Sequence, residues 1–321
     1  MRKTVVSFAV NLLRLQSGRC SMKSEDLLAN TTRLGPVHLR VIDIPAALPL
    51  WRDVIGLAVL ANDGGTADLG VDGKSLIVLH AGATTALPPK SRDLFHVAVH
   101  VTTRKELARV AARLGAARVK HGAQDHLVSE SLYASDLSGN GIEICFDTPD
   151  RFASSTVTAD GSVSLLARDG SAHSGLEPLD LDRLLLELDT ADGIEAPLAA
   201  DAFIGHIHMR ARSPETLMAF YLGVLGFKPH IQSTSFGLFD CGTDERRHMV
   251  AFNIWAGAEL TEPPPGSAGL EHFTAVLPSQ EDMAAVAQRL RHANVPARQT
   301  ERTLDVSDPE GNRLRMMAAG D

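Results

Sequence analysis

Apolar and polar residues alternate along several short stretches of the chain. The run LFHVAVHV (residues 94–101) has the period of two that is typical of a β-strand, and it carries His96. Farther on, SESLYAS and GIEICF have the same character, and the segment DLSGNG between them predicts a turn. This hairpin is expected to carry Tyr133 on its first strand and Glu143 on its second, with His126 just upstream.

Glu143 is unusual for a strand of this kind, because its neighbours are Ile142 and Ile144. Either the carboxylate faces solvent while the isoleucines face a core, or it faces a cavity in which something binds it. One histidine and one carboxylate on neighbouring strands are two-thirds of the facial triad that holds non-haem Fe(II). The pattern therefore raises the question of a third ligand.

The chain also repeats itself. Residues 35–57 (GPVHLRVIDIPAALPLWRDVIGL) and 205–227 (GHIHMRARSPETLMAFYLGVLGF) match at an offset of 170 without a gap. Both begin with a strand that carries a histidine, His38 or His208, and both continue through a turn into an amphipathic helix. A second pair of segments, LFHVAVHVTTRKELARVAARLG and LEHFTAVLPSQEDMAAVAQRLR, also joins a strand to a helix.

Shorter strands follow each helix, so the repeat predicts four β-α-β-β-β units. They lie near residues 35–82, 94–149, 203–256 and 269–318. These bounds suggest an N-terminal domain of two units at 33–149 and a C-terminal domain of two units at 203–321. Between them we expect a polar linker at 150–202, in which LDLDRLLLELD predicts a short helix. Residues 1–32 are expected to be a disordered or over-extended start, with Met22 as a candidate initiator.

Composition narrows the function classes. The net charge of −8 and the lack of a basic run longer than RR argue against nucleic-acid binding. No apolar run approaches the roughly 20 residues of a transmembrane helix. Three scattered cysteines suit a reducing cytosol rather than a disulfide framework, so a cytoplasmic protein is expected. A homo-oligomer is compatible with this composition.

Four such units resemble the vicinal oxygen chelate superfamily, which includes glyoxalase I, bleomycin-resistance proteins and extradiol dioxygenases. The resemblance covers nearly the whole chain after about residue 33, and it is closest to two-domain catechol 2,3-dioxygenases. The motifs that carry it are IGHIHMR, RRHMVAFNIWAG, LFHVAV and DHLVSESLYASDLSGNGIEIC. It implies an α+β fold in which units pair into two cup-shaped, half-barrel sheets around a metal.

The resemblance also implies site residues. Extradiol dioxygenases bind their metal through two histidines and one glutamate, which here match His96, Glu143 and a first-strand histidine of a partner unit. His248, Tyr133 and His126 match the family's catalytic residues. The fourth unit cannot complete a triad, because Arg315 stands where a glutamate is required.

The partner unit remains open at this point. Short connections favour pairing of units 1 and 2, with His38 as the third ligand. Completeness of the chemical set favours units 2 and 3, with His208 as the third ligand and His248 close by. We predict the second arrangement.

The resemblance implies an Fe(II)-dependent enzyme that cleaves catechol or a substituted catechol with O₂, although the ligand set suits Mn(II) as well. Two rivals remain. One is a glyoxalase- or epimerase-like metalloenzyme of the same superfamily, for which a second carboxylate is not evident. The other is a metal-free binding protein of the bleomycin-resistance type, in which the three ligand side chains would point apart.

Overall fold

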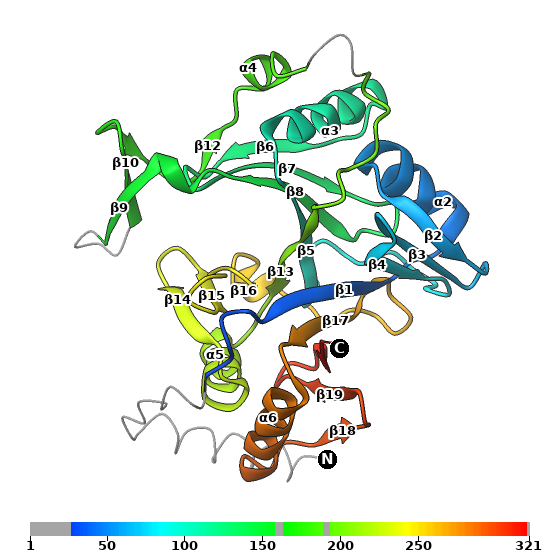
Figure 1. Ribbon diagram of the computed structural model, residues 1–321, viewed down its shortest axis with the longest axis vertical. Helices are drawn as coiled ribbons and strands as arrows, with labels where there is room; N and C mark the ends of the chain where they lie inside the picture. Colours follow the sequence, from blue (N-terminus) through cyan, green and yellow to red (C-terminus); the bar gives the residue numbers. More distant parts are fainter. Residues whose placement is uncertain (1–26, 158–162, 189–192, 320–321) are drawn as a thin grey trace.

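The computed structural model describes residues 27–157, 163–188 and 193–319 (Figure 1). It contains the four predicted β-α-β-β-β units. Unit 1 consists of β1 (Arg33–Arg40), α2 (Ile44–Leu48) continued by a π-helical turn (Pro49–Ile55), β2 (Ala58–Asn62), β3 (Thr66–Val71) and β4 (Lys74–His80). Unit 2 consists of β5 (Asp93–Val101), α3 (Arg104–Ala116), β6 (Gly122–Asp125), β7 (Ser129–Ser135) and β8 (Gly141–Asp147).

The second half repeats this order. Unit 3 consists of β13 (Phe203–Arg210), α5 (Pro214–Phe220) continued by a π-helical turn (Tyr221–Leu225), β14 (Lys228–Ser233), β15 (Leu238–Gly242) and β16 (Val250–Asn253). Unit 4 consists of β17 (Gly269–Leu277), α6 (Gln280–His292), β18 (Ala297–Gln299), β19 (Thr303–Ser307) and β20 (Arg313–Ala318). The α+β fold of paired units is confirmed.

The units pair across the two halves of the chain. One sheet has the order β12-β6-β7-β8-β5-β13-β16-β15-β14 and joins units 2 and 3; we call it the 2/3 sheet. The other has the order β18-β19-β20-β17-β1-β4-β3-β2 and joins units 4 and 1; we call it the 1/4 sheet. The predicted pairing of units 2 and 3 is confirmed, but neither sheet is confined to one of the sequential halves 33–149 and 203–321.

Contacts of the helices join the units that do not share a sheet, namely units 1 and 2 and units 3 and 4. Arg113 of α3 donates to the carbonyls of Val54 and Ile55, which end the helix of unit 1. Arg289 of α6 makes the same two contacts to the carbonyls of Val224 and Leu225 in unit 3. The last carbonyls of a helix have no partner within the helix, so a guanidinium from a neighbouring helix is a favourable one. The four units thus form a closed ring through alternating sheet and helix contacts.

The helices begin at side-chain caps that the sequence encodes. The hydroxyl of Thr103 accepts from the amide of Glu106 at the start of α3, and Ser279 accepts from Asp282 at the start of α6. Leu107, the first large apolar residue of α3, is fully buried against the sheet core. Period and capping therefore both fix these helices.

The linker contains more structure than expected. The predicted short helix is α4 (Leu181–Leu185). In addition, β9 (Phe152–Val157), β10 (Val163–Ala167) and β11 (Ala172–His173) form a separate three-stranded sheet, and β12 (Glu177–Pro178) extends the 2/3 sheet. The β9–β10 pair projects from the body of the molecule in Figure 1.

The described residues before β1 pack against the body of the protein. Residues 1–26 of the expected disordered start lie outside the described residues. Leu28 and Thr32 are buried, and the amide of Leu28 donates to the carbonyl of Gly226.

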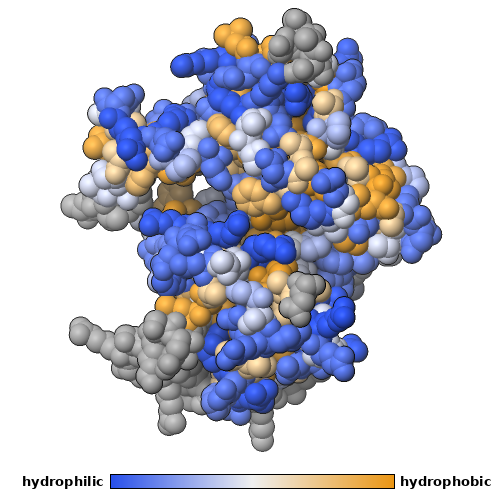
Figure 2. Space-filling view, viewed as in Figure 1, coloured by the Kyte–Doolittle hydropathy of each residue, from blue (hydrophilic) through white to orange (hydrophobic). Residues whose placement is uncertain are grey.

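The face seen in Figure 2 is mainly polar with small apolar patches. No helix within the described ranges is long and apolar enough to cross a membrane.

Candidate metal centre

Three side chains meet on one face of the 2/3 sheet because of the register of its central strands. Ala98 of β5 lies opposite Glu143 of β8 on one side and opposite His206 of β13 on the other. Cross-strand partners point to the same face, and so does His96, two residues before Ala98. The small side chain of Ala98 leaves the space above it to the three larger ones.

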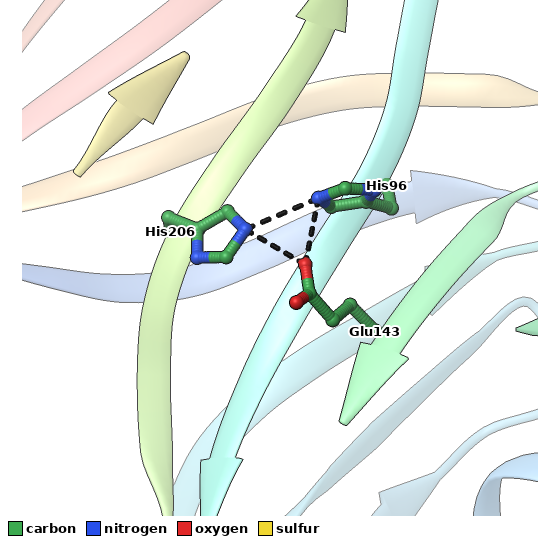
Figure 3. A group of neighbouring side chains, drawn as sticks. All are labelled: His96, Glu143 and His206. Atoms are coloured by element: carbon green, nitrogen blue, oxygen red, sulfur yellow. Dashed lines mark hydrogen bonds and ion pairs between the residues drawn. The ribbon is translucent and has the colours of Figure 1, made fainter. Parts of the chain in front are cut away.

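The ligand atoms of His96, Glu143 and His206 converge on one point (Figure 3). The Oε2 atom of Glu143 lies 2.8 Å from Nε2 of His96 and 2.9 Å from Nε2 of His206. The two Nε2 atoms are 3.1 Å apart. Ligands at about 2.1 Å from a metal and at right angles to one another are about 3.0 Å apart. The three atoms therefore fit one face of an octahedral site for a divalent cation.

The protonation of this group also suits a cation. All three side chains are buried. Burial works against the carboxylate of Glu143, but His206 and His96 outweigh it and hold the pKa of Glu143 well below its ordinary value. Burial lowers the pKa of His206 to about 3. An ionised carboxylate beside a neutral imidazole is the form in which these groups bind metals.

The predicted residues Tyr133 and His126 lie behind the glutamate. The hydroxyl of Tyr133 donates to Oε1 of Glu143 at 2.9 Å, and its oxygen is 2.8 Å from Nε2 of His126. Burial, with the Glu143 carboxylate, raises the pKa of Tyr133, which favours the neutral phenol as donor. The carboxylate is thereby divided: Oε1 faces Tyr133 and Oε2 faces the histidines.

His248 lies on the other flank of the group. Its ring centroid is 4.5 Å from that of His206, and its Nδ1 contacts the carboxylate of Asp240, which is buried. Burial disfavours the charged imidazole, but Asp240 outweighs it and raises the pKa of His248. The imidazole is thus oriented by a carboxylate and prepared to accept a proton.

His208 differs from the prediction. It lies on the same face of β13 as His206, but its Nε2 is 3.0 Å from Nδ2 of Asn253 and is not among the converging ligand atoms. Burial lowers the pKa of His208 well below its ordinary value, which suits a neutral acceptor for the Asn253 amide. The third member of the group is therefore His206.

The repeat concealed His206, because Pro36 occupies the matching position in unit 1. One signal was available in the sequence. In GHIH the two histidines are two residues apart on a strand and must share a face, a reason to weigh His206 that the prediction of His208 did not use. The alternative ligand His38 lies in the 1/4 sheet, paired with His272 of β17.

A second group of polar side chains lies beside the first. His100 of β5 contacts Asp147 of β8 through Nδ1 at 3.0 Å, and Cys145 lies close to the same carboxylate. The ligand atoms of these three residues lie within 4.8 Å of one another. Nε2 of His100 is 3.4 Å from Nδ1 of His206, so the two groups are in contact.

Comparison with known proteins shows the family of the chain. The family model of the glyoxalase/bleomycin resistance protein/dioxygenase superfamily matches residues 203–316. A protein of Bacillus subtilis (strain 168) named catechol-2,3-dioxygenase is 33% identical over 281 residues, which cover 87% of this chain and 94% of that protein. The chain belongs to this superfamily.

Solved structures support the same fold at lower identity. A candidate dioxygenase from Bacillus subtilis subsp. subtilis str. 168 has a TM-score of 0.56 at 13% identity, over 89% of this chain and 86% of the other. A glyoxalase I variant from Zea mays has a TM-score of 0.53 at 12% identity, over 90% and 94% of the two chains. Members of the superfamily with different chemistry thus share the paired-unit architecture, and the site must decide the reaction.

Proposed function

We propose that this vicinal oxygen chelate protein is an Fe(II)-dependent extradiol dioxygenase that opens the ring of catechol or a substituted catechol beside its two hydroxyls. The observation that carries the proposal is the convergence of Nε2 of His96, Nε2 of His206 and Oε2 of Glu143, with pairwise distances of 2.8, 2.9 and 3.1 Å. The relative named catechol-2,3-dioxygenase supports the choice of reaction. Mn(II) suits the same ligands.

His96, His206 and Glu143 would hold the metal. The chemistry that Fe(II) supplies when bound is the passage of electron density from a chelated catechol to O₂, and three protein ligands leave open positions for both. The residues of the chain hold and orient these partners and accept the protons of the substrate.

Tyr133 fixes the direction of the carboxylate. Its hydroxyl occupies Oε1 of Glu143, so that Oε2 is the oxygen directed at the two histidines. A carboxylate held in this way binds a cation through one oxygen, which keeps the remaining positions free for substrate. His126, in contact with the same hydroxyl, orients Tyr133 from the outer side.

His248 is the base in this proposal. A catechol that binds through two oxygens must give up hydroxyl protons, and a neighbouring imidazole is a suitable acceptor. Asp240 contacts Nδ1 of His248, which leaves Nε2 to face the substrate. The same carboxylate stabilises the charged imidazole after the proton has been taken.

The test is turnover under controlled metal loading. The metal-free protein is loaded anaerobically with Fe(II), then mixed with catechol and O₂. The expected result is the yellow ring-opened semialdehyde, with one O₂ consumed for each product formed. Glu143→Gln is the matched inactive control, because it keeps the size of the side chain and removes its charge.

Two other results would contradict the proposal. Stoichiometric iron binding without ring opening, across catechols of different substitution, would favour a glyoxalase- or epimerase-like reaction. Failure to bind any divalent metal would favour a binding protein of the bleomycin-resistance type.

A further inference from the structure

We infer that His100 and Asp147 form an outer-shell relay that positions His206 and selects the tautomer in which Nε2 of His206 can bind the metal. The inference rests on the proposed metal site and concerns two residues that the proposed reaction does not use. Neither is expected to touch the substrate, so both are positioning residues.

The relay follows from three contacts in line. Nε2 of His206 faces Glu143, so its Nδ1 is directed away from the ligand group. Nδ1 lies 3.4 Å from Nε2 of His100, and the opposite nitrogen of His100 lies 3.0 Å from Oδ2 of Asp147. His100 is buried, whereas the side chain of Asp147 is 55% exposed. The line thus runs from the ligand group to the surface.

Gly205 makes room for this line. A Cβ atom at position 205 would lie 1.9 Å from Cδ2 and 2.1 Å from Nε2 of His100. Such distances are far below any van der Waals contact, so no other residue fits while the ring remains in place. The register of β13 against β5 also shifts between Ile204 and His206. The backbone here is shaped around the imidazole of His100.

Proton positions then follow from the chemistry of imidazole. A neutral imidazole donates through one nitrogen and accepts through the other. If Nε2 of His206 gives its lone pair to a metal, Nδ1 carries the proton and donates to Nε2 of His100. His100 must then carry its own proton on Nδ1, which donates to Asp147. With both imidazoles neutral and Asp147 ionised, each contact has one donor and one acceptor only in this direction.

The same reasoning weighs against a second metal bound by His100, Cys145 and Asp147. A metal on Nδ1 of His100 would require that His100 donate through Nε2, so that Nδ1 of His206 becomes the acceptor. Neutral His206 would then carry its proton on Nε2, which is the atom directed at Glu143 and His96. The two sites would compete for one lone pair.

The 1/4 sheet provides an independent argument. The registers of the two sheets place Val276 where β5 has His100, and Ala319 where β8 continues to Asp147. Pro36 stands in place of His206 at the same time. All three members of the line are replaced together in the sheet that lacks the triad, as expected if they serve the metal.

The experiment titrates the metal-free full-length protein with Co(II), which reports its ligands by absorption and by contact-shifted imidazole N–H resonances. His100→Val, which introduces the residue of the 1/4 sheet, is expected to weaken Co(II) binding by about 10- to 100-fold and to remove the slowly exchanging N–H resonance of His206. His100→Gln, whose amide oxygen can still accept at the place of Nε2, should recover most of the affinity. Asp147→Asn should give a smaller loss in the same direction without disturbing the core.

His272→Gln is the matched control, since it also changes a buried strand histidine, and it should bind Co(II) as the unchanged protein does. Equal affinity and an unchanged N–H resonance in His100→Val and Asp147→Asn would overturn the relay while leaving the metal site intact. A thiolate-to-cobalt absorption band that disappears in Cys145→Ser would place the metal at Cys145 instead and overturn it as well. If the unchanged protein binds no Co(II), the proposed function fails together with the relay.

Discussion

The 2/3 sheet and the 1/4 sheet share a framework and differ in their chemistry. In the 2/3 sheet His208 is paired with His96, and in the 1/4 sheet His38 is paired with His272 in the same register. The parallel neighbours repeat as well: Glu143 lies opposite Ala98 on β5, as Arg315 lies opposite Thr274 on β17. The backbone alone therefore does not make a metal site.

The differences lie at a few inward-facing positions. Glu143 becomes Arg315, and its partner across β7, Tyr133, becomes Asp305 on β19. Arg315 and Asp305 contact each other at 2.7 and 3.1 Å, which places a fixed positive group where the other sheet has a carboxylate. The 1/4 sheet therefore lacks the anionic ligand, and Pro36 stands where the 2/3 sheet has His206, so its described strands offer no site for a divalent cation.

The histidines that remain in the 1/4 sheet interact with one another. The ring of His38 stacks on that of His272 at 3.9 Å, and Nδ1 of His38 is 2.9 Å from Nε2 of His80. Burial, followed by the charge of Arg315, lowers the pKa of His272 to about 4, and burial lowers that of His38 to about 3. The imidazoles of His38 and His272 are therefore neutral at physiological pH and act as packing groups.

The largest effect is expected from making the 2/3 sheet resemble the 1/4 sheet. Glu143→Arg removes the anionic ligand and places a cation beside His96 and His206, so metal binding and turnover should fall below detection. The milder Glu143→Gln should lose metal by more than the roughly 100-fold that an outer-shell change costs. Metal content by elemental analysis and oxygen uptake measure both. An Arg variant that retains full metal content would show that Glu143 is not a ligand.

The next effect separates the two histidines of β13. His206→Ala should abolish stoichiometric metal binding, because it removes one of the three converging ligand atoms. His208→Ala should retain the metal, since Nε2 of His208 is engaged with Asn253. Isothermal titration with Co(II) compares the two variants directly. The opposite order would restore His208 as the third ligand.

This pair of variants also separates the features of the site that the sequence could predict from those that it could not. The four units followed from periodicity and the repeat, and the proximity of His96 and Glu143 from their places on neighbouring strands. The pairing of units 2 and 3 followed from the completeness of the chemical set that the family resemblance implies. His206 did not, because choosing between two histidines on one face of a strand requires the register against β5, where a bulge lies beside Gly205. The line from Asp147 through His100 was out of reach for the same reason. Strands β9–β11 are short, and their apolar residues follow no clear period, so the sequence did not predict them.

Substitution of His248, beside the metal-binding group, should change metal binding little but lower turnover strongly. His248→Phe keeps an aromatic ring beside His206 and removes the base, so turnover should fall by about 10²- to 10⁴-fold while the metal is retained. His272→Phe, the same exchange of an imidazole for a phenyl ring on β17 of the 1/4 sheet, is the control and should leave turnover unchanged. Full activity of His248→Phe would remove His248 from the mechanism.

A turn that both sheets share predicts a pH effect outside the metal site. Asp136 in DLSGNG and Asp308 in DPEGNR each accept from the amide and side chain of an asparagine four residues later. Burial raises the pKa of Asp308 to about 6 and raises that of Asp136. The folded protein therefore binds a proton at Asp308 more tightly than the unfolded chain does, and its free energy of unfolding falls as the pH rises from about 4 to 6.

A pKa of about 6 for Asp308 in the folded state corresponds to a contribution of about 3 kcal/mol. Asp308→Asn keeps one acceptor oxygen and cannot ionise, so urea unfolding at several pH values should show this slope in the wild type and lose it in the variant. Asp136→Asn should change the slope in the same direction. A wild-type minus Asp308→Asn difference that stays constant between pH 4 and 7 would mean that Asp308 is not protonated preferentially in the folded state.

The smallest effect is expected from His38, the residue that the repeat offered as an alternative ligand. His38→Ala breaks its contact with Nε2 of His80 and its stacking on His272, so the free energy of unfolding should fall by about 1 kcal/mol. Metal content and turnover should equal those of the wild type, because His38 lies in the other sheet and faces Arg315 rather than a carboxylate. Loss of metal from this variant, with the metal retained in His206→Ala, would move the centre to the 1/4 sheet and reverse the contrast between the two sheets.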